Sequence, residues 1–179
     1  LIHRNIVGNV LQAYAWIKPA ISEGQETIIT ALPLYHIFAL TANCFTFFQI
    51  GAKNVLIANP RDIPGFAAEL AKHKFSVITG VNTLFNALLN NEQFCALDFS
   101  SLKVTLGGGM AVQKAVADKW KRVTGTPLLE AYGLTETSPA ATINPLTLKD
   151  YNGSIGLPIS STEVIVVDDA GAEVAHGQP

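Results

Sequence analysis

The segment EAYGLTETSP, residues Glu130 to Pro139, directly follows the short apolar run Thr126 to Leu129. The apolar run is typical of a buried strand, so the polar residues after it are expected at the carboxyl end of that strand. Open α/β sheets bind their ligands at this edge. Within the six positions Tyr132 to Thr137, the segment supplies an aromatic ring, a residue without a side chain, two hydroxyls and one carboxylate, from Tyr132, Gly133, Thr135, Thr137 and Glu136. These groups suit a nucleotide triphosphate and its magnesium ion, although a polar loop without a ligand would have the same composition.

The residues before this segment alternate between strand, turn and helix four times. Short apolar or β-branched runs predict strands at Thr27 to Leu32, Val55 to Ala58, Phe75 to Thr79 and Lys103 to Leu106. Apolar residues at helical spacing predict helices between these strands, and another helix at Asn5 to Ile17. Since the connections are too long for hairpins, we expect an α/β fold with a mainly parallel sheet flanked by helices.

Right-handed crossovers would place the turns that follow parallel strands on one edge of the sheet. These turns are Tyr35-His36, Asn59 to Asp62, Gly80 to Thr83, Gly107 to Met110 and Tyr132 to Glu136. A composite site built from several loops is the natural consequence. His36 stands where a strand gives way to a helix, a position that suits either a structural hydrogen-bonding group or a catalytic one.

The pattern changes after Pro139. Residues 140–153 have no regular periodicity, and the run Thr162 to Asp168 predicts a strand that is followed by a hairpin turn at Asp168 to Gly171. We therefore expect residues 1–139 to form an α/β subdomain. Residues 140–179 are expected to be an irregular segment that leads into an antiparallel β layer.

The composition describes a globular protein of 179 residues, of which 49% are hydrophobic. The formal charge of −2 gives no electrostatic reason to expect nucleic acid or an anionic membrane as the main partner. Cys44 and Cys95 have no second cysteine or clustered histidine nearby, so we interpret them as reduced thiols in the cytoplasm. The longest apolar run, Ile37 to Ile50, predicts a buried helix and is too short to span a bilayer.

The run LGGGM at Leu106 to Met110 has two interpretations. It can be a tight turn between a strand and a helix, or it can let a ligand approach the backbone closely because side chains are missing. The run lacks the Lys-Ser/Thr ending of a phosphate-binding P-loop and the spacing of a dinucleotide site. We therefore interpret it as one wall of an adenine or acyl pocket.

Four motifs occur in a fixed order: PLYH at Pro33 to His36, LGGGM at Leu106 to Met110, EAYGLTETSP at Glu130 to Pro139 and SIGLP at Ser154 to Pro158. Together they resemble the adenylate-forming superfamily of acyl-CoA synthetases, luciferases and peptide-synthetase adenylation domains. The intervening segments most closely resemble bacterial long-chain fatty-acid–CoA ligases, at NPRDIP (Asn59 to Pro64), ITGVNTLFNALL (Ile78 to Leu89) and LDFSSL (Leu97 to Leu102).

The resemblance implies a two-step ligase. The carboxylate of a fatty acid attacks the α-phosphate of ATP with the help of Mg²⁺, and coenzyme A then displaces AMP to give the thioester. It also implies an internal fragment of a large N-terminal domain, inactive alone, without the upstream phosphate loop and the C-terminal lid domain. A homodimer and peripheral attachment to the inner face of the cytoplasmic membrane stay open. So do another carboxylic acid as substrate and a non-catalytic nucleotide-binding module.

The resemblance also implies roles for individual residues. The catalytic residues are expected to be His36, Thr135 and Glu136, with Glu136 as the Mg²⁺ ligand. The expected nucleotide-binding residues are Gly108, Gly109, Met110, Glu130, Ala131, Tyr132, Gly133 and Thr135. The expected acyl-binding residues are Tyr35, His36, Leu40, Val81, Asn82, Leu84 and Gly107. Relatives often have Gly at the position of Ala131, and some have an aromatic gate at that of Leu40.

Overall fold

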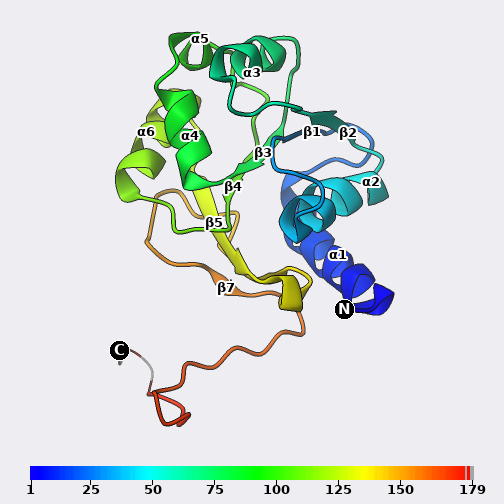
Figure 1. Ribbon diagram of the computed structural model, residues 1–179, viewed down its shortest axis with the longest axis vertical. Coiled ribbons are helices and arrows are strands. Elements are labelled where there is room, and N and C mark those ends of the chain that lie inside the picture. Colours follow the sequence, from blue (N-terminus) through cyan, green and yellow to red (C-terminus); the bar gives the residue numbers. More distant parts are fainter. Residues whose placement is uncertain (176, 178–179) are drawn as a thin grey trace.

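The computed structural model describes residues 1–175 and residue 177. Within them the strands form one seven-stranded sheet in the order β2-β1-β3-β4-β5-β6-β7 (Figure 1). The strands are β1 (Thr27–Thr30), β2 (Lys53–Leu56), β3 (Val77–Gly80), β4 (Val104–Gly107), β5 (Leu128–Gly133), β6 (Ala140–Ile143) and β7 (Leu157–Pro158). The first five are parallel, and β6 and β7 continue the sheet in antiparallel pairing. The expected mainly parallel sheet with an antiparallel end is therefore confirmed.

Helices cover both faces of this sheet. They are α1 (His3–Ile17), η1 (Lys18–Ala20), η2 (Ala39–Phe45), α2 (Thr46–Gln49), α3 (Ile63–Leu70), α4 (Asn82–Leu89), α5 (Glu92–Cys95), α6 (Lys114–Thr124) and η3 (Thr135–Thr137). In Figure 1, α4 and α6 lie on one side of the central strands, and α1 and α2 lie on the other. The helices on each side bury apolar side chains against the sheet, whereas the short η1 and η3 bury none.

Two hydrophobic clusters show how neighbouring strand residues serve opposite faces. Ile29 and Ile78 belong to a large cluster with the helices α3 to α6, whereas Ile28 and Val77 belong to a smaller cluster beside α1 and α2. Successive strand residues alternate between faces, so the continuous apolar runs are the mark of strands that are buried on both sides. The large cluster is centred on Trp120, whose indole N–H donates to the Thr105 hydroxyl at 3.1 Å.

Several local expectations differ from the structure. Strand β5 extends to Gly133, so Tyr132 lies on the strand and not in the turn after it. Residues 140–143 form β6, where we expected irregular chain, because they pair with β5 across a short turn. The boundary expected at Pro139 thus separates two paired strands, and it stays a prediction. The short helix α5 was not expected at all.

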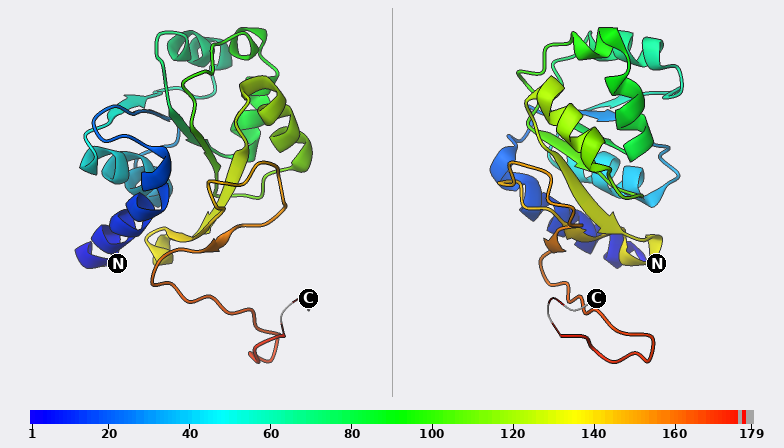
Figure 2. Two further views of the ribbon diagram at one scale, coloured as in Figure 1. Left: turned by 180° about the vertical axis from the view of Figure 1, so that it is seen from behind. Right: turned by 90° about the vertical axis from the view of Figure 1, so that its left-hand side faces the viewer.

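The strand expected at Thr162 to Asp168 is wrong. This part of the chain extends away from the sheet (Figure 2), and its Val164 to Val167 side chains are about half exposed or more. A single antiparallel bridge joins Val167 to Glu173, and the Gly171 N–H donates to the Asp168 carbonyl across the expected turn. β-branched composition favours a strand only where another strand is available to pair with it. Among the described residues, no helix is both long and apolar enough to cross a bilayer.

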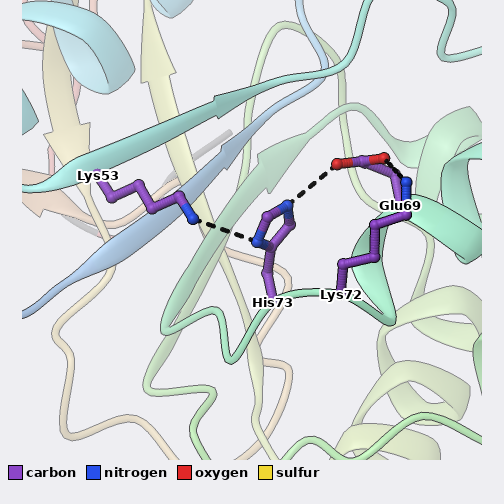
Figure 3. Close-up of polar contacts among 4 residues, drawn as sticks. All are labelled: Lys53, Glu69, Lys72 and His73. Atoms are coloured by element: carbon purple, nitrogen blue, oxygen red, sulfur yellow. Dashed lines mark hydrogen bonds and ion pairs between the residues drawn. The ribbon is translucent and has the colours of Figure 1, made fainter.

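A series of polar contacts near the surface joins β2 to the end of α3 (Figure 3). Lys53 Nζ lies 3.4 Å from His73 Nδ1, and His73 Nε2 lies 3.1 Å from Glu69 Oε1. Lys72 Nζ lies 2.6 Å from the other Glu69 oxygen. Hydrogen bonds from Lys72 and then His73 lower the pKa of the Glu69 carboxyl. Solvent screens such exposed ion pairs, so these contacts add little to the free energy of unfolding.

An ion pair at the amino ends of the parallel strands, with a buried carboxylate and a partly exposed lysine, has a larger effect. The Glu26 side chain is 1% exposed, and its Oε1 atom accepts from Lys103 Nζ at 2.7 Å and from the Ser22 N–H at 2.6 Å. Burial opposes ionisation, but hydrogen bonds from Lys103, Ser76 and Ser22 outweigh it, so the pKa of the Glu26 carboxyl lies below its ordinary value. The pair joins the start of β1 to the start of β4.

We predict that Glu26→Gln lowers the free energy of unfolding at pH 7 by about 1.5–3 kcal/mol, because the charged hydrogen bond is lost. A depressed folded-state pKa stabilises the fold above the unfolded-state pKa, and this stabilisation is lost as pH falls through the folded-state value. The difference between the wild-type chain and the variant should therefore shrink below about pH 4. Urea unfolding of both proteins across this pH range measures the difference in the free energy of unfolding.

The control Asp118→Asn, in an exposed pair with Lys114, should lower the free energy of unfolding by less than about 0.5 kcal/mol. An equal loss at every pH would contradict the prediction.

Candidate functional site

A cavity of about 310 Å³ lies between one face of the sheet and the helices α1, η2 and α2. Its mouth is at the carboxyl ends of β4 and β5, next to the turn that carries η3. From there it runs under η2 toward the amino ends of β3 and β4, where Val77 and Val104 line it. Its mouth is lined by polar groups and glycines and its interior mostly by apolar side chains, which is a common composition for a small-molecule site.

Eight of the residues expected at the site line this cavity: His36, Gly108, Gly109, Ala131, Tyr132, Gly133, Thr135 and Glu136. They come from three separate segments: the turn after β1, the turn after β4, and the β5–η3 segment. His36, Tyr132 and Glu136 thus share one cavity despite their separation in the sequence. The parallel register of β1, β3, β4 and β5 brings these segments together, because it aligns the carboxyl ends of the four neighbouring strands.

The PLYH turn holds the His36 ring in a defined state. The His36 N–H donates to the Pro33 carbonyl at 2.9 Å, and the Phe38 N–H lies 3.2 Å from His36 Nδ1. Because Nδ1 accepts this hydrogen bond, the neutral imidazole carries its proton on Nε2. The exposed ring can therefore donate from Nε2 to a carbonyl or carboxylate oxygen in the cavity.

The wall formed by η2 is fixed to the sheet by a buried amide. Asn43 is fully buried, and its Nδ2 atom donates to the hydroxyls of Thr79 at 2.8 Å and Thr30 at 3.0 Å. The Asn54 amide in turn donates to the Asn43 carbonyl at 3.1 Å. This part of the helix has π geometry, with the Thr46 N–H bonded to the Thr41 carbonyl five residues earlier. π turns inside helices often occur at functional sites.

The hairpin between β5 and β6 sets the other side of the mouth. A Cβ atom at Gly133 would overlap the carbonyl of Pro139, so only glycine lets the two strands approach this closely. The Thr137 hydroxyl closes the turn through the Leu134 backbone N–H at 2.8 Å. This turn leaves Thr135 and Glu136 exposed at the mouth, next to the Tyr132 ring, which is 44% exposed.

The structure does not bring the other expected residues into the cavity. Glu130 is buried, and its carboxylate accepts from the Val112 N–H at 3.0 Å. Burial and then the charge of Glu130 raise the pKa of the nearby Tyr151 hydroxyl. Met110 is half exposed beside Gly109, and Tyr35 is 91% exposed. Leu40 lies on η2 but is not among the lining residues.

Four of the expected acyl-binding residues lie against the opposite face of the sheet. Leu84 is part of the large core cluster, and Val81 packs against the same cluster. The Asn82 side chain accepts from the Gln113 N–H at 2.9 Å, at the start of α6. A Cβ atom at Gly107 would lie 2.7 Å from the Val112 side chain, so this glycine serves the packing of that core.

Sequence analysis missed the side chains that line the interior of the cavity. They are Asn9, Ala13, Ile17, Ile21, Ile37, Phe38, Thr41, Ala42, Thr46, Phe47, Val77, Thr79, Val104 and Leu106, with Leu134, Pro139, Ala140 and Ile143 near the mouth. Helical spacing had indicated that α1 has an apolar face. It could not indicate that this face borders a cavity, because periodicity does not distinguish a cavity wall from a packed core.

The exposed carboxylate of Glu136 is suited to bind magnesium. Among the described residues, no group of three His, Cys, Asp or Glu side chains gathers to form a complete metal cage. Mg²⁺ commonly binds through one or two carboxylates together with substrate phosphates and water. An exposed carboxylate at the mouth of a cavity meets that requirement, and the Thr135 hydroxyl lies next to it in the sequence.

A parallel sheet with a cavity at its carboxyl edge defines an α/β ligand-binding protein. A family profile described as "AMP-binding enzyme" matches residues 1–179. The chain therefore belongs to the AMP-binding enzyme family. This agrees with the resemblance carried by the four sequence motifs.

Proteins named long-chain-fatty-acid–CoA ligase are similar to the whole chain. Those of Yersinia pestis and Escherichia coli O157:H7 are 58% and 56% identical over 179 residues, and each match covers 100% of this chain and 32% of the relative. The ligase of Bacillus subtilis strain 168 is 32% identical over 99% of this chain and 32% of its own length. The chain thus spans about a third of the curated relatives it matches.

Solved structures share the fold. The anthranilate CoA ligase AuaEII in complex with anthranoyl-AMP superposes with a TM-score of 0.84 at 24% identity, over 98% of this chain and 34% of that one. An ATP-bound RpMatB-BxBclM chimera gives a TM-score of 0.81 at 25% identity, over 99% of this chain and 34% of that one. The seven-stranded architecture is therefore that of adenylate-forming ligases.

Two threonines on the cavity wall should respond oppositely to replacement by valine. The Thr41 hydroxyl is buried without a hydrogen-bond partner in the described part of the chain, whereas Thr79 bonds to Asn43 in both directions. We predict that Thr79→Val destabilises the fold by about 1–3 kcal/mol, because it leaves buried amide groups unpaired. Thr41→Val should be neutral or stabilising, since it removes an unpaired polar group. Urea unfolding of both variants measures the difference, and equal destabilisation would contradict the assigned hydrogen bonds.

Proposed function

We propose that this chain is part of a long-chain fatty-acid–CoA ligase and provides the adenylation site together with the cavity for the acyl tail. One observation carries the proposal: His36, Tyr132 and Glu136 line the mouth of a cavity whose interior is apolar. The relatives named long-chain-fatty-acid–CoA ligase and the ATP-bound structural neighbours support it. The substrates are a fatty acid, ATP and coenzyme A.

The nucleotide occupies the mouth of the cavity. The exposed ring of Tyr132 offers a face on which adenine stacks, and Gly109, which has a φ of 77°, lets the base approach the backbone. Gly108 and Ala131 line the same part of the cavity. A Cβ atom at Gly108 would lie 3.0 Å from the Phe38 ring, so this position accommodates little more than hydrogen.

In the first step a carboxylate oxygen of the fatty acid attacks the α-phosphorus of ATP. The new O–P bond forms as the bond to the β-phosphate oxygen breaks, and pyrophosphate leaves. Two anions must meet, so their repulsion has to be offset. Glu136 would hold Mg²⁺, which neutralises charge on phosphate oxygens when bound. Thr135 donates a hydroxyl hydrogen bond to the phosphate, and His36 Nε2–H donates to the acyl carboxylate.

In the second step the thiol of coenzyme A attacks the acyl carbonyl. The S–C bond forms as the C–O bond to AMP breaks, and the thiol proton is released to solvent. His36 keeps the carbonyl oriented through the same Nε2–H, because its Nδ1 atom is already occupied by the Phe38 N–H. The ring therefore positions the adenylate in both steps.

The acyl tail extends from the mouth into the apolar interior. Each buried methylene contributes about 0.8 kcal/mol, so a long chain gains much of its binding energy there. The expected wall at Val81 and Leu84 lies against the other face of the sheet, and the tail instead runs beside α1 and η2. The proposed tail site thus differs from the one that the family resemblance implied.

We predict that Glu136→Ala in the complete ligase lowers the rate of ATP–pyrophosphate exchange by about 10²–10³-fold, because a group that stabilises transition-state charge is removed. The measurement uses palmitate as the acid with saturating Mg²⁺. Glu163→Ala is the matched control, since it removes an exposed carboxylate on the extended segment away from the cavity. If Glu136→Ala and Glu163→Ala have equal small effects, the chain is a binding module and not the adenylation site.

We also predict that the isolated chain catalyses neither step at a measurable rate. Among the described lining residues there is no Lys or Arg to neutralise a triphosphate, and the chain covers about a third of its relatives. ATP–pyrophosphate exchange and acyl-CoA formation by the purified chain are the measurements. Robust exchange by the chain alone would contradict this division of work between the chain and the rest of the ligase.

A location in the cytoplasm, peripheral membrane attachment and a homodimer stay predictions. The reduced cysteines support the first, the family resemblance alone suggests the other two, and the cavity geometry does not depend on any of them. A different acid substrate is tested by a substrate screen on the complete ligase. A preference for aryl or short acids over palmitate would favour that alternative.

A further inference from the structure

One helix runs along the cavity from its mouth to its inner end. Asn9, Ala13 and Ile17 stand four residues apart on α1, so they form one stripe on the helix, and all three line the cavity. At 1.5 Å per residue, this stripe covers about 12 Å of depth. The same helix keeps other apolar residues, such as Leu11, on its exposed side.

Hydrogen bonds from its middle and from its carboxyl end fix the position of α1 relative to the sheet. Near the mouth, Asn9 Nδ2 donates to the Ala140 carbonyl at 2.9 Å, and the Ala140 N–H donates back to Asn9 Oδ1 at 3.0 Å. Near the carboxyl end of α1, the Trp16 indole N–H donates to the Asn144 carbonyl at 3.2 Å. A helix that is anchored twice to one strand segment cannot slide along the cavity, so its side chains mark constant depths.

The inner end of the cavity is closed by packed side chains. Five residues that line the cavity also belong to the small core cluster or pack against it: Ile17, Ile21, Phe47, Val77 and Val104. From Val104 to Gly107, where β4 ends, three residue steps of extended strand span about 10 Å. An extended acyl chain advances about 1.25 Å per carbon–carbon bond, so the part of the cavity beside β4 matches about 8 bonds.

We propose that α1 is the ruler that sets the acyl chain length, with Ala13 at half depth and Ile17 at the floor. This inference rests on the proposed function, because it assigns the tail to the cavity. Ala13 is 8% exposed and small, and its methyl group leaves the cavity passable at this level. A larger side chain there would block the path below it, and a smaller one at Ile17 would deepen the floor.

The test uses two substitutions with opposite expected effects in the complete ligase. Ala13→Leu should move the preferred substrate to shorter chains by about four or five carbons, since Ala13 lies about 6 Å above Ile17. Ile17→Ala should move it to longer chains by one or two carbons. The measurement is kcat/KM for saturated fatty acids from octanoate to stearate. For Ala13→Leu, palmitate should lose at least about tenfold, and octanoate less than about twofold.

Controls separate this inference from the proposed function. Leu11→Phe adds bulk on the exposed side of α1 and should leave the length profile unchanged. If Ala13→Leu melts below the assay temperature, Ala13→Val provides a smaller obstruction and Ile17→Ala provides the opposite change. An unchanged chain-length profile in folded Ala13 and Ile17 variants, or an equal loss of kcat/KM for all chain lengths, contradicts the proposal that α1 sets the acyl chain length. If the wild-type ligase activates no fatty acid at all, the proposed function fails instead.

Discussion

The site depends on one buried interaction, the set of hydrogen bonds that the Asn43 side chain makes with Thr30 and Thr79 on two neighbouring strands. In a low-dielectric interior these bonds are strong, and an amide there has no alternative partner in water. They hold η2 against the sheet at a fixed height. The turn with His36 leads directly into this helix, so the depth of the cavity and the position of the imidazole follow from the same contact.

The two faces of the sheet differ, because one is covered by a packed core and the other borders the cavity. The face under α3 to α6 is filled by interlocking aromatic rings, with the Phe85 and Trp120 rings 4.8 Å apart at an angle of 71°. That side carries most of the packing energy, because close-packed apolar side chains lose water and gain contacts. The face under α1 and η2 is therefore free to keep a cavity. Glu130 and Gly107 contact Val112 on the packed side, so they stabilise the strands next to the cavity and do not line it.

The sequence could predict the parts whose physics is local. Strands such as β1 and β3 are buried on both faces and carry the apolar runs from which they were predicted. The Asp62 carboxylate caps α3 through the Gly65 N–H at 3.0 Å, a role typical of aspartate just before a helix. The motifs also indicated which residues meet at the carboxyl edge. Local patterns could not show that β6 pairs with β5, or that α1 lines the cavity while Leu84 faces the opposite core. Those facts depend on which face of the sheet each helix covers.

The charge of the proposed reaction exceeds what the described cavity lining can neutralise by itself. A carboxylate and a triphosphate repel each other, and His36 is the one residue with a cationic form among the described lining residues. Glu136 adds a further negative charge, which is favourable only when it binds a cation. Under the proposed function, the walls described above would orient the base and the tail, and most of the positive charge would come from bound Mg²⁺ and from residues outside the described lining.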